Sequence, residues 1–177
     1  DEFIDLLRAR HATLMSGRPE IAGVFKTLSN QAGMTLFVDP ALVDGTLREG
    51  WRRLAELDTA WERAAYMMFL VSEVHPFNDG NGRIARVMMN AELVVGRQSK
   101  IIVPTGFRSD YLSALRRLSR DDDPSVYIKA LRFLHDYTAQ IDWTAHDTAE
   151  ADLRTTNAFE ETDDAQRLRL LRPAAPT

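Results

Sequence analysis

A twelve-residue stretch, residues 75–86, interrupts the helical pattern that runs through most of this chain. It reads HPFNDGNGRIAR, so a proline and a glycine turn separate two segments with helical apolar spacing. Proline disfavours helical geometry in the residue before it, so the preceding helix must break at His75. A new helix is predicted to start at about Gly80–Gly82. We expect the rest of the chain to be a helical scaffold that presents this loop.

The segments around the loop predict an all-α fold with one small β-hairpin. The apolar run at residues 64–71 lies in a helix that is apolar nearly all round, which is typical of a central helix. Apolar spacing and chain breakers predict helices at about 2–15, 46–57, 59–73, 81–95, 110–118, 124–141 and 144–159. Asp58 or Thr59 is expected to cap the third of these, Asp110 the fifth, and Gly96 to end the fourth.

The hairpin is predicted from two short β-like runs, Val24–Leu28 and Thr35–Val38. The linker between them, residues 29–34, is rich in turn residues. Two strands alone are marginally stable, so we expect the hairpin to be mobile unless something docks on it.

Composition narrows the class of protein and the partners. The chain has 177 residues, of which 45% are hydrophobic and 27% charged, as in ordinary globular proteins. A net charge of −4 argues against general nucleic-acid binding, and no apolar run approaches the ~20 residues of a membrane span. The absence of cysteine excludes a disulfide framework and fits a reducing compartment. We therefore expect a cytoplasmic protein with neither a nucleic-acid nor a membrane partner.

One domain is expected over residues 1–160, with its core at about 1–140 and a possible extra C-terminal helix at 144–160. The last residues, 161–177, are predicted to be a disordered tail. The chain begins at Asp1 without a methionine. This start predicts that it is a piece of something longer.

The glycine turn of the loop is suited to an anion. Small residues at Gly80 and Gly82 let backbone N–H groups approach closely, and the free N–H groups and dipole of a helix start favour negative charge. Arg83 and Arg86 share a helix face beside this turn, where they oppose the dipole unless an anion compensates. Each feature has a plain alternative, since a Gly-x-Gly is often only a turn and the arginines would make an ordinary solvated pair.

Two further side chains of the loop are suited to chemistry. His75 could accept a proton near neutral pH, although a lone histidine is more often a polar helix end. Asp79 could bind Mg²⁺, which prefers one or two carboxylates plus substrate phosphates, or could simply cap the helix. Phe77 is expected to point into the core and anchor the loop. The remaining histidines lack such a context and are interpreted as ordinary helix residues: His11, His135 and His146. The joint occurrence of these features favours a polyphosphate site.

The same residues resemble the signature of the Fic family. That signature is His-x-Phe-x-Asp/Glu-Gly-Asn-Gly-Arg-x-x-Arg, and residues 75–86 match every specified position. The resemblance extends over roughly residues 1–140. The hairpin at about 23–38 resembles the family's flap, and the segments Leu14–Gly17 and Phe37–Pro40 beside it are similar to the family's flanking segments. A Fic-type helical bundle with a flap near the active site is implied.

The resemblance implies a protein adenylyltransferase, which transfers AMP from ATP to a Ser, Thr or Tyr hydroxyl of a target protein and releases pyrophosphate. His75 would be the general base, and Asp79 would hold Mg²⁺ between the α- and β-phosphates. The Gly80–Gly82 backbone and the Asn81 side chain would cradle the phosphates. The nucleotide-binding residues would be Gly80, Asn81, Gly82, Arg83 and Arg86, with Tyr111 bordering the adenine pocket.

The flap implies a way to dock the target protein. An edge strand offers unpaired N–H and C=O groups, so it can add an extended target segment by β-pairing. This pairing is largely independent of sequence. The docking residues would be Val24, Phe25, Lys26, Thr27, Leu36 and Phe37.

Regulation is implied by what the chain lacks. Many Fic proteins carry an inhibitory helix with Ser/Thr-x-x-x-Glu-Gly/Asn, whose glutamate pairs with the second signature arginine, here Arg86. Two partial matches, Ser16–Glu20 and Thr156–Glu160, both lack the final Gly or Asn. We therefore expect the inhibitory segment upstream of Asp1 or on an antitoxin-like partner.

Other functions stay open. A related Fic transferase moves phosphate or phosphocholine, but the phosphate-transferring branch departs from the signature at its glycines, and Gly80 and Gly82 are both present here. The same site could instead remove AMP. A nucleotide-binding regulatory module is a further alternative, although it would usually have lost His75 or Asp79.

Overall fold

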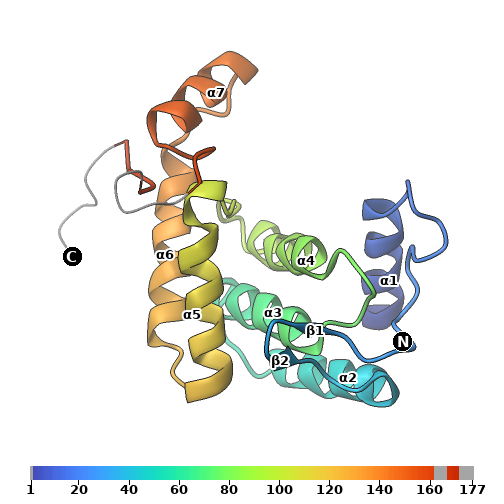
Figure 1. The fold of residues 1–177 in the computed structure, drawn as a ribbon. Coiled ribbons are helices and arrows are strands. Elements are labelled where there is room, and N and C mark those ends of the chain that lie inside the picture. The colour runs from blue at the N-terminus through green and yellow to red at the C-terminus, as the bar shows by residue number, and fades with distance from the viewer. Residues whose placement is uncertain (1, 162–166, 172–177) are drawn as a thin grey trace. The chain divides into compact units, whose positions relative to one another are not determined.

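The computed structural model of the protein describes residues 2–161 and 167–171. The chain divides into two compact units, Asp1–Gln98 and Ser99–Thr177. The domain predicted over residues 1–160 therefore spans both units. In the described residues, regular structure consists of helices and one two-stranded hairpin (Figure 1), which confirms the predicted all-α fold.

The first unit holds four α-helices and the hairpin. Helix α3 packs along α4, and α2 packs on α3 (Figure 1). The elements are α1 (Glu2–Leu14), β1 (Gln31–Ala32), β2 (Thr35–Leu36), η1 (Pro40–Leu42), α2 (Val43–Leu54), α3 (Ala60–Val74) and α4 (Asn81–Val95), where η1 is a short 3-10 helix.

Helix α3 is the core of this unit, as its apolar sequence predicts. Thr59 begins it with a capping box: its hydroxyl accepts from the Glu62 N–H at 3.1 Å, and the Glu62 carboxylate accepts from the Thr59 N–H at 2.9 Å. The side chains with no exposed surface on this helix are Ala64, Met67, Met68 and Val71.

Two glycines let neighbouring helices approach α3 closely. A Cβ at Gly50 of α2 would overlap the Leu70 side chain, and one at Gly96 would overlap the Ala60 side chain. Gly96 follows α4 as predicted, but its φ of −78° is ordinary. Its absent side chain therefore serves close packing and not the left-handed turn that the sequence suggested.

The second strand of the hairpin begins at Thr35 as predicted, but the first strand lies later in the chain than predicted. Gln31 pairs with Leu36 and Ala32 with Thr35 in antiparallel register, around the two-residue turn Gly33–Met34. Gly33 has φ +59°, which a type II′ turn requires at its first central residue. The prediction of a strand at Val24–Leu28 is wrong.

That segment pairs with the signature loop instead of with the hairpin. Phe25 forms an isolated antiparallel bridge with Phe77. The backbone N–H of Lys26 donates to the Pro76 carbonyl at 2.8 Å. The residues that pair with this segment lie far away in sequence, so the local pattern does not indicate this pairing. Its short β-like run predicts a hairpin strand instead.

The described residues of the second unit form three α-helices, with α5 packed on α6. They are α5 (Arg108–Asp121), preceded by the short 3-10 helix η2 (Thr105–Phe107), α6 (Ser125–Gln140) and α7 (His146–Thr155). Asp110 lies within the first turn of α5 and does not cap it, because the helix already begins at Arg108.

The end of α7 meets the last described residues. The Thr156 hydroxyl lies 2.8 Å from the Tyr137 hydroxyl, and the Thr156 carbonyl accepts from the Arg169 N–H at 3.0 Å. Leu168 is buried. The rest of the predicted tail, residues 162–166 and 172–177, lies outside the described residues. No helix in the described part of the chain combines the length and apolar character needed to cross a bilayer.

Candidate active site

The signature loop joins the end of α3 to the start of α4. His75 ends α3 in the left-handed region with φ 50°, and Gly80 precedes α4 with φ +78°. A side chain at Gly80 would also be crowded, since its Cβ would lie 3.0 Å from the Met15 sulfur and 3.1 Å from His11 Nε2. Two left-handed residues thus turn the chain and leave the His75 ring and the α4 N-terminus on one short loop.

His75 is held in the protonation state that a base needs. Its Nδ1 lies 3.1 Å from the Ser72 carbonyl oxygen, which can only accept, so Nδ1 carries the proton and Nε2 keeps its lone pair. The ring stacks on Phe37, with centroids 3.7 Å apart. Burial lowers the pKa of His75, the Ser72 carbonyl opposes this, and the charge of Lys26 lowers the pKa further. The imidazole is therefore neutral at pH 7.

Lys26 stabilises the signature loop through hydrogen bonds of its buried ammonium group. Its side chain is 3% exposed, and Nζ donates to the Val74 carbonyl at 3.2 Å and to Asn30 Oδ1 at 2.7 Å. Asn30 Nδ2 in turn donates to the Phe77 carbonyl at 3.0 Å. The assignment of Lys26 to an exposed docking edge is therefore corrected, because its ammonium group is committed to the loop.

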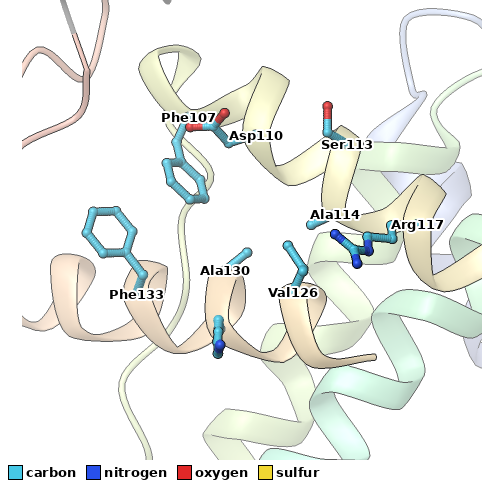
Figure 2. Close-up of a pocket in the computed structure, with 9 residues that line it drawn as sticks. Phe107, Asp110, Ser113, Ala114, Arg117, Val126, Ala130 and Phe133 are labelled. Carbon is cyan, nitrogen blue, oxygen red and sulfur yellow. The ribbon is translucent and has the colours of Figure 1, made fainter. Parts of the chain in front are cut away.

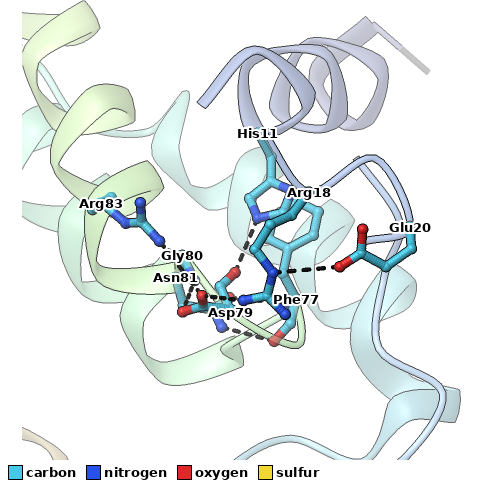
Figure 3. A network of polar contacts seen from close by, with 8 residues as sticks. All are labelled: His11, Arg18, Glu20, Phe77, Asp79, Gly80, Asn81 and Arg83. Carbon is cyan, nitrogen blue, oxygen red and sulfur yellow. Dashed lines mark hydrogen bonds and ion pairs between the residues drawn. The ribbon is translucent and has the colours of Figure 1, made fainter. Parts of the chain in front are cut away.

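Asp79 lies among two guanidinium groups and a backbone donor (Figure 3). Its Oδ2 accepts from Arg18 Nη1 at 2.9 Å and lies 3.5 Å from Arg83 Nη2. Its Oδ1 accepts from the Gly80 N–H at 2.6 Å. The side chain is 49% exposed, so an incoming ligand can reach the carboxylate.

The Asp79 carboxylate fits a magnesium ion shared with a substrate. The described residues contain no cluster of three or more His, Cys, Asp or Glu side chains that could enclose a metal ion. Mg²⁺ commonly uses one carboxylate and completes its shell with phosphate oxygens and water. A single half-exposed carboxylate at the start of a helix suits that arrangement and does not suit a closed protein cage.

Asn81 has a role that the sequence did not predict for it. Its side chain is 3% exposed, with Oδ1 accepting from the Phe77 N–H at 2.9 Å and Nδ2 donating to the Phe77 carbonyl at 2.7 Å (Figure 3). The prediction that this amide cradles phosphates is therefore corrected. The side chain of Asn81 stabilises the loop by bonding to the Phe77 backbone, so the group that Asn81 offers at the start of α4 is its backbone N–H.

The two signature arginines lie at the N-terminal turns of α4. Arg83 is 48% exposed and faces Asp79. The Arg86 guanidinium lies beside Gly82, with Nη1 3.6 Å from the position of a Cβ there. Together with the N–H groups that begin α4, they provide a positively polarised surface for phosphate oxygens.

His11 also contacts the signature loop, although the sequence pattern predicts no role for it at the site. Its ring has no exposed surface and stacks on Phe77 with centroids 3.6 Å apart. Nε2 lies 3.0 Å from the Asp79 carbonyl oxygen, and Nδ1 accepts from the Gly23 N–H at 3.0 Å. The available signal was its place on the buried stripe of α1, after Phe3 and Leu7.

The predicted docking residues of the flap divide into two groups. Val24, Thr27 and Leu36 are exposed. Phe25 packs on Phe77 at 5.2 Å between ring centroids, and Phe37 packs on His75. Leu28 and Met34, which were not predicted to dock, are more exposed than Val24 at 77% and 96% against 44%. Tyr111 lies on α5 in the second unit, and its contact with adenine stays a prediction.

Neither partial inhibitory match lies on a helix. Ser16–Glu20 falls between α1 and the hairpin, where Glu20 Oε1 accepts from Arg18 Nε at 3.3 Å. Thr156–Glu160 begins only after α7 has ended.

A separate hollow lies in the second unit between α5 and α6 (Figure 2). Its volume is about 470 Å³. Its lining includes Phe107, Asp110, Ser113, Arg117, Lys129 and Phe133, none of which belongs to the signature loop.

Comparison with known families and proteins agrees with this geometry. The model of the Fic/DOC family matches residues 4–93, which include most of α1, the hairpin, the signature loop and most of α4. The protein adenylyltransferase fic-1 of Caenorhabditis elegans is 30% identical over 115 residues, covering 63% of this chain and 23% of that protein. The protein adenylyltransferase Fic of Drosophila persimilis is 36% identical over 75 residues, covering 42% and 14%. The chain thus spans less than a quarter of the length of these relatives.

Solved structures show the same fold. A fragment of Fic-1 from C. elegans superposes with a TM-score of 0.64 at 26% identity, covering 75% of this chain and 40% of that one. The BepC effector protein of Bartonella tribocorum, solved with bound AMPPNP, superposes with a TM-score of 0.61 at 15% identity, covering 74% and 73%.

Proposed function

The chain belongs to the Fic/DOC family, and we propose that it is a protein adenylyltransferase. It transfers AMP from ATP to the hydroxyl group of a Ser, Thr or Tyr residue in a target protein and releases pyrophosphate. The observation that carries this proposal is the contact of His75 Nδ1 with the Ser72 carbonyl oxygen, which directs the proton to Nδ1 and leaves Nε2 to act as acceptor, on the same short loop as the N-terminus of α4. The curated relatives named as protein adenylyltransferases support it.

The proposed reaction uses His75 as a general base. The target hydroxyl gives its proton to Nε2 while its oxygen forms a bond to the α-phosphorus of ATP. The bond between this phosphorus and the bridging oxygen of pyrophosphate breaks, and pyrophosphate leaves with the electron pair. Because burial and Lys26 keep the imidazole neutral, the base is ready at pH 7.

The start of α4 would bind the phosphates and stabilise the leaving charge. The N–H groups of Gly82 and its neighbours, Arg83 and Arg86 all lie at this end of the helix. Positioning and fixed positive charge account for most catalysis of phosphoryl-type transfer. Asp79 would hold Mg²⁺, which neutralises phosphate charge when bound.

The hairpin would dock the target protein by strand addition. Its two strands have open edges in the described structure, and its exposed side chains are apolar at Met34 and Leu36. Phe37 directly follows β2 and stacks on His75. A segment paired with β2 would therefore run toward the base. The cytoplasmic location and the absence of a nucleic-acid partner stay predictions.

Parallel incubations with α-labelled and γ-labelled ATP test the proposed function. Label from the α-phosphate is expected to stay on protein, and label from the γ-phosphate is expected to leave with pyrophosphate. Retention of γ-label with loss of α-label would instead identify a phosphate-transferring member of the family.

The rate of transfer is expected to fall at acidic pH. Protonation of His75 removes the acceptor, and its pKa lies below the ordinary value of 6.5. The acid limb of a kcat/KM profile should therefore have its midpoint below pH 6.5, with a plateau through neutrality. A midpoint above 6.5 would contradict a His75 pKa that is lowered by burial.

Arg18→Ala is expected to lower the Mg²⁺ concentration that gives half-maximal transfer. Arg18 occupies Asp79 Oδ2 at 2.9 Å, so a metal ion must displace it. An exposed ion pair contributes about 0.2–1 kcal/mol, which corresponds to a decrease of up to about fivefold. Arg48→Ala, which breaks an exposed pair with Asp44 on α2, is the control. An increase in half-saturation for Arg18→Ala would mean that Arg18 helps to hold the nucleotide.

A further inference from the structure

A buried histidine, His11, packs against the signature loop, and the proposed reaction does not use it. His11 comes from α1, 68 positions before Asp79, and both of its ring nitrogens are hydrogen-bonded to backbone groups. Figure 3 shows the contact of Nε2 with the Asp79 carbonyl oxygen. We propose that His11 is a positioning residue that holds the Asp79 peptide and the base of the flap in one fixed arrangement. This inference rests on the proposed function of the loop.

Only one form of the imidazole satisfies both neighbours. The Gly23 N–H can only donate, so Nδ1 must be unprotonated. The Asp79 carbonyl oxygen can only accept, so Nε2 must carry the proton. Each nitrogen thus serves a different segment of the chain. A side chain with a single polar atom could not make both bonds.

The bond from Nε2 acts on the residue proposed to hold the metal ion. It fixes the carbonyl of Asp79, while the carboxylate of the same residue turns to Arg18 and Arg83. The following peptide leads into Gly80, where a Cβ would lie only 3.1 Å from Nε2. His11 therefore lies against the point at which α4 begins, and it constrains both the carboxylate and the helix start.

The bond from Nδ1 acts on the base of the flap. Gly23 donates its N–H to His11, and its carbonyl accepts from Arg8 Nε at 2.8 Å. Its φ is +70°, and a Cβ would lie 2.9 Å from the Arg8 carbonyl oxygen. Both backbone polar groups of Gly23 are thus hydrogen-bonded to side chains of α1. Gly23 lies three residues before Lys26, which pairs with Pro76.

The third contact of His11 is the stacking of its ring on Phe77. His11 and Phe77 lie nearly parallel, 3° apart, and the other neighbour of Phe77 is the ring of Phe25. An ordinary core histidine would contribute through such packing alone. The proposal differs because it assigns a separate task to each nitrogen, and substitutions can separate these tasks.

Three variants separate them. His11→Asn places an acceptor near Nδ1 and removes the donor to Asp79. His11→Gln places an amide donor near Nε2 and removes the acceptor for Gly23. His11→Phe keeps the stack on Phe77 and removes both bonds. His146→Asn, at an exposed histidine of α7, is the matched control.

Binding and exchange measurements give readouts that do not need catalysis. The gain in ATP affinity on adding Mg²⁺, measured by calorimetry, is expected to fall at least about fivefold in His11→Asn and His11→Phe and to stay near the wild-type value in His11→Gln. Amide hydrogen exchange at Gly23 is expected to accelerate in His11→Gln and His11→Phe and to stay slow in His11→Asn.

Turnover should follow the bond to Asp79. We expect kcat to decrease about tenfold or more in His11→Asn and His11→Phe, with His11→Gln restoring most of it. Thermal unfolding of each variant shows how much stability was lost. If the Asn and Gln variants lose activity and magnesium response equally, in step with stability, His11 is only a core residue and the inference is overturned. An inactive wild-type protein would instead count against the proposed function. The pattern of amide exchange at Gly23 would still test whether His11 holds the base of the flap.

Discussion

His75→Ala is expected to abolish AMP transfer while leaving the affinity for ATP within about twofold of wild type. The substitution removes the Nε2 acceptor, and a positioned general base contributes roughly 10²–10⁴-fold to such a step. It leaves the α4 N-terminus, Arg83 and Arg86 in place for the phosphates. Transfer of α-label and calorimetric titration with ATP measure the two quantities.

The control for this substitution is His146→Ala. His146 is exposed on α7 and lies outside the signature loop, so its loss should change neither transfer nor binding. If His75→Ala kept transfer within about tenfold of wild type, His75 would not be the base. If it lost ATP affinity together with transfer, the ring would have a structural role at the nucleotide site.

Gly80→Ala is expected to cause the second large effect, on both stability and ATP binding. The residue has φ +78°, and its new Cβ would approach Met15 and His11 at 3.0 and 3.1 Å. Left-handed backbone costs a non-glycine residue roughly 1–2 kcal/mol, and the crowding adds to this. Because Gly80 precedes α4, a shift there moves the N–H groups that face the phosphates. We expect about a tenfold loss of ATP affinity in the fraction that folds.

Gly33→Ala separates backbone strain from crowding. Gly33 has a similar φ of +59°, but a Cβ there would have no atom within 4 Å. Denaturant unfolding should therefore show a smaller loss of stability for Gly33→Ala than for Gly80→Ala, with ATP affinity unchanged. Equal losses in the two variants would mean that the packing of Met15 and His11 on the loop adds nothing.

The sequence predicted the parts of the fold that depend on near neighbours. Thr59 and Glu62 form a capping box three residues apart, and Pro76 ends α3 where its ring disfavours helix. The signature loop was recognisable because its residues are contiguous. The turn at Gly33–Met34 lies within the predicted linker, residues 29–34, whereas the first strand forms at Gln31–Ala32 and not at Val24–Leu28.

Contacts between distant segments could not be predicted in this way. The apolar spacing of α4 predicts core positions at Ile84, Val87, Met88, Ala91 and either Val94 or Val95. Ile84 and Met88 are buried, whereas Val87, Val94 and Val95 are exposed at 39%, 51% and 77%. Which side of an apolar helix is buried depends on how many elements pack against the helix. The spacing of its apolar residues does not show how many there are. A long polar side chain such as Lys26 is usually exposed, so its burial against Val74 had no local signal.

The active-site loop shows the same division. His75, Asp79 and the glycines were identified from their order in the chain. The support beneath them comes from His11, Gly23 and other residues far away in sequence. The resemblance to the Fic signature implies that the Asn81 side chain contacts the phosphates, but its amide is hydrogen-bonded to the Phe77 backbone. Side-chain direction depends on the folded loop, and the sequence pattern does not specify it.

Mass spectrometry of proteins incubated with this chain, Mg²⁺ and ATP tests the central claim most directly. We predict peptides that carry one AMP group on a Ser, Thr or Tyr hydroxyl with wild-type protein, and none with His75→Ala. Peptides carrying phosphate in place of AMP, or AMP-bearing peptides that are equally abundant with His75→Ala, would contradict the account.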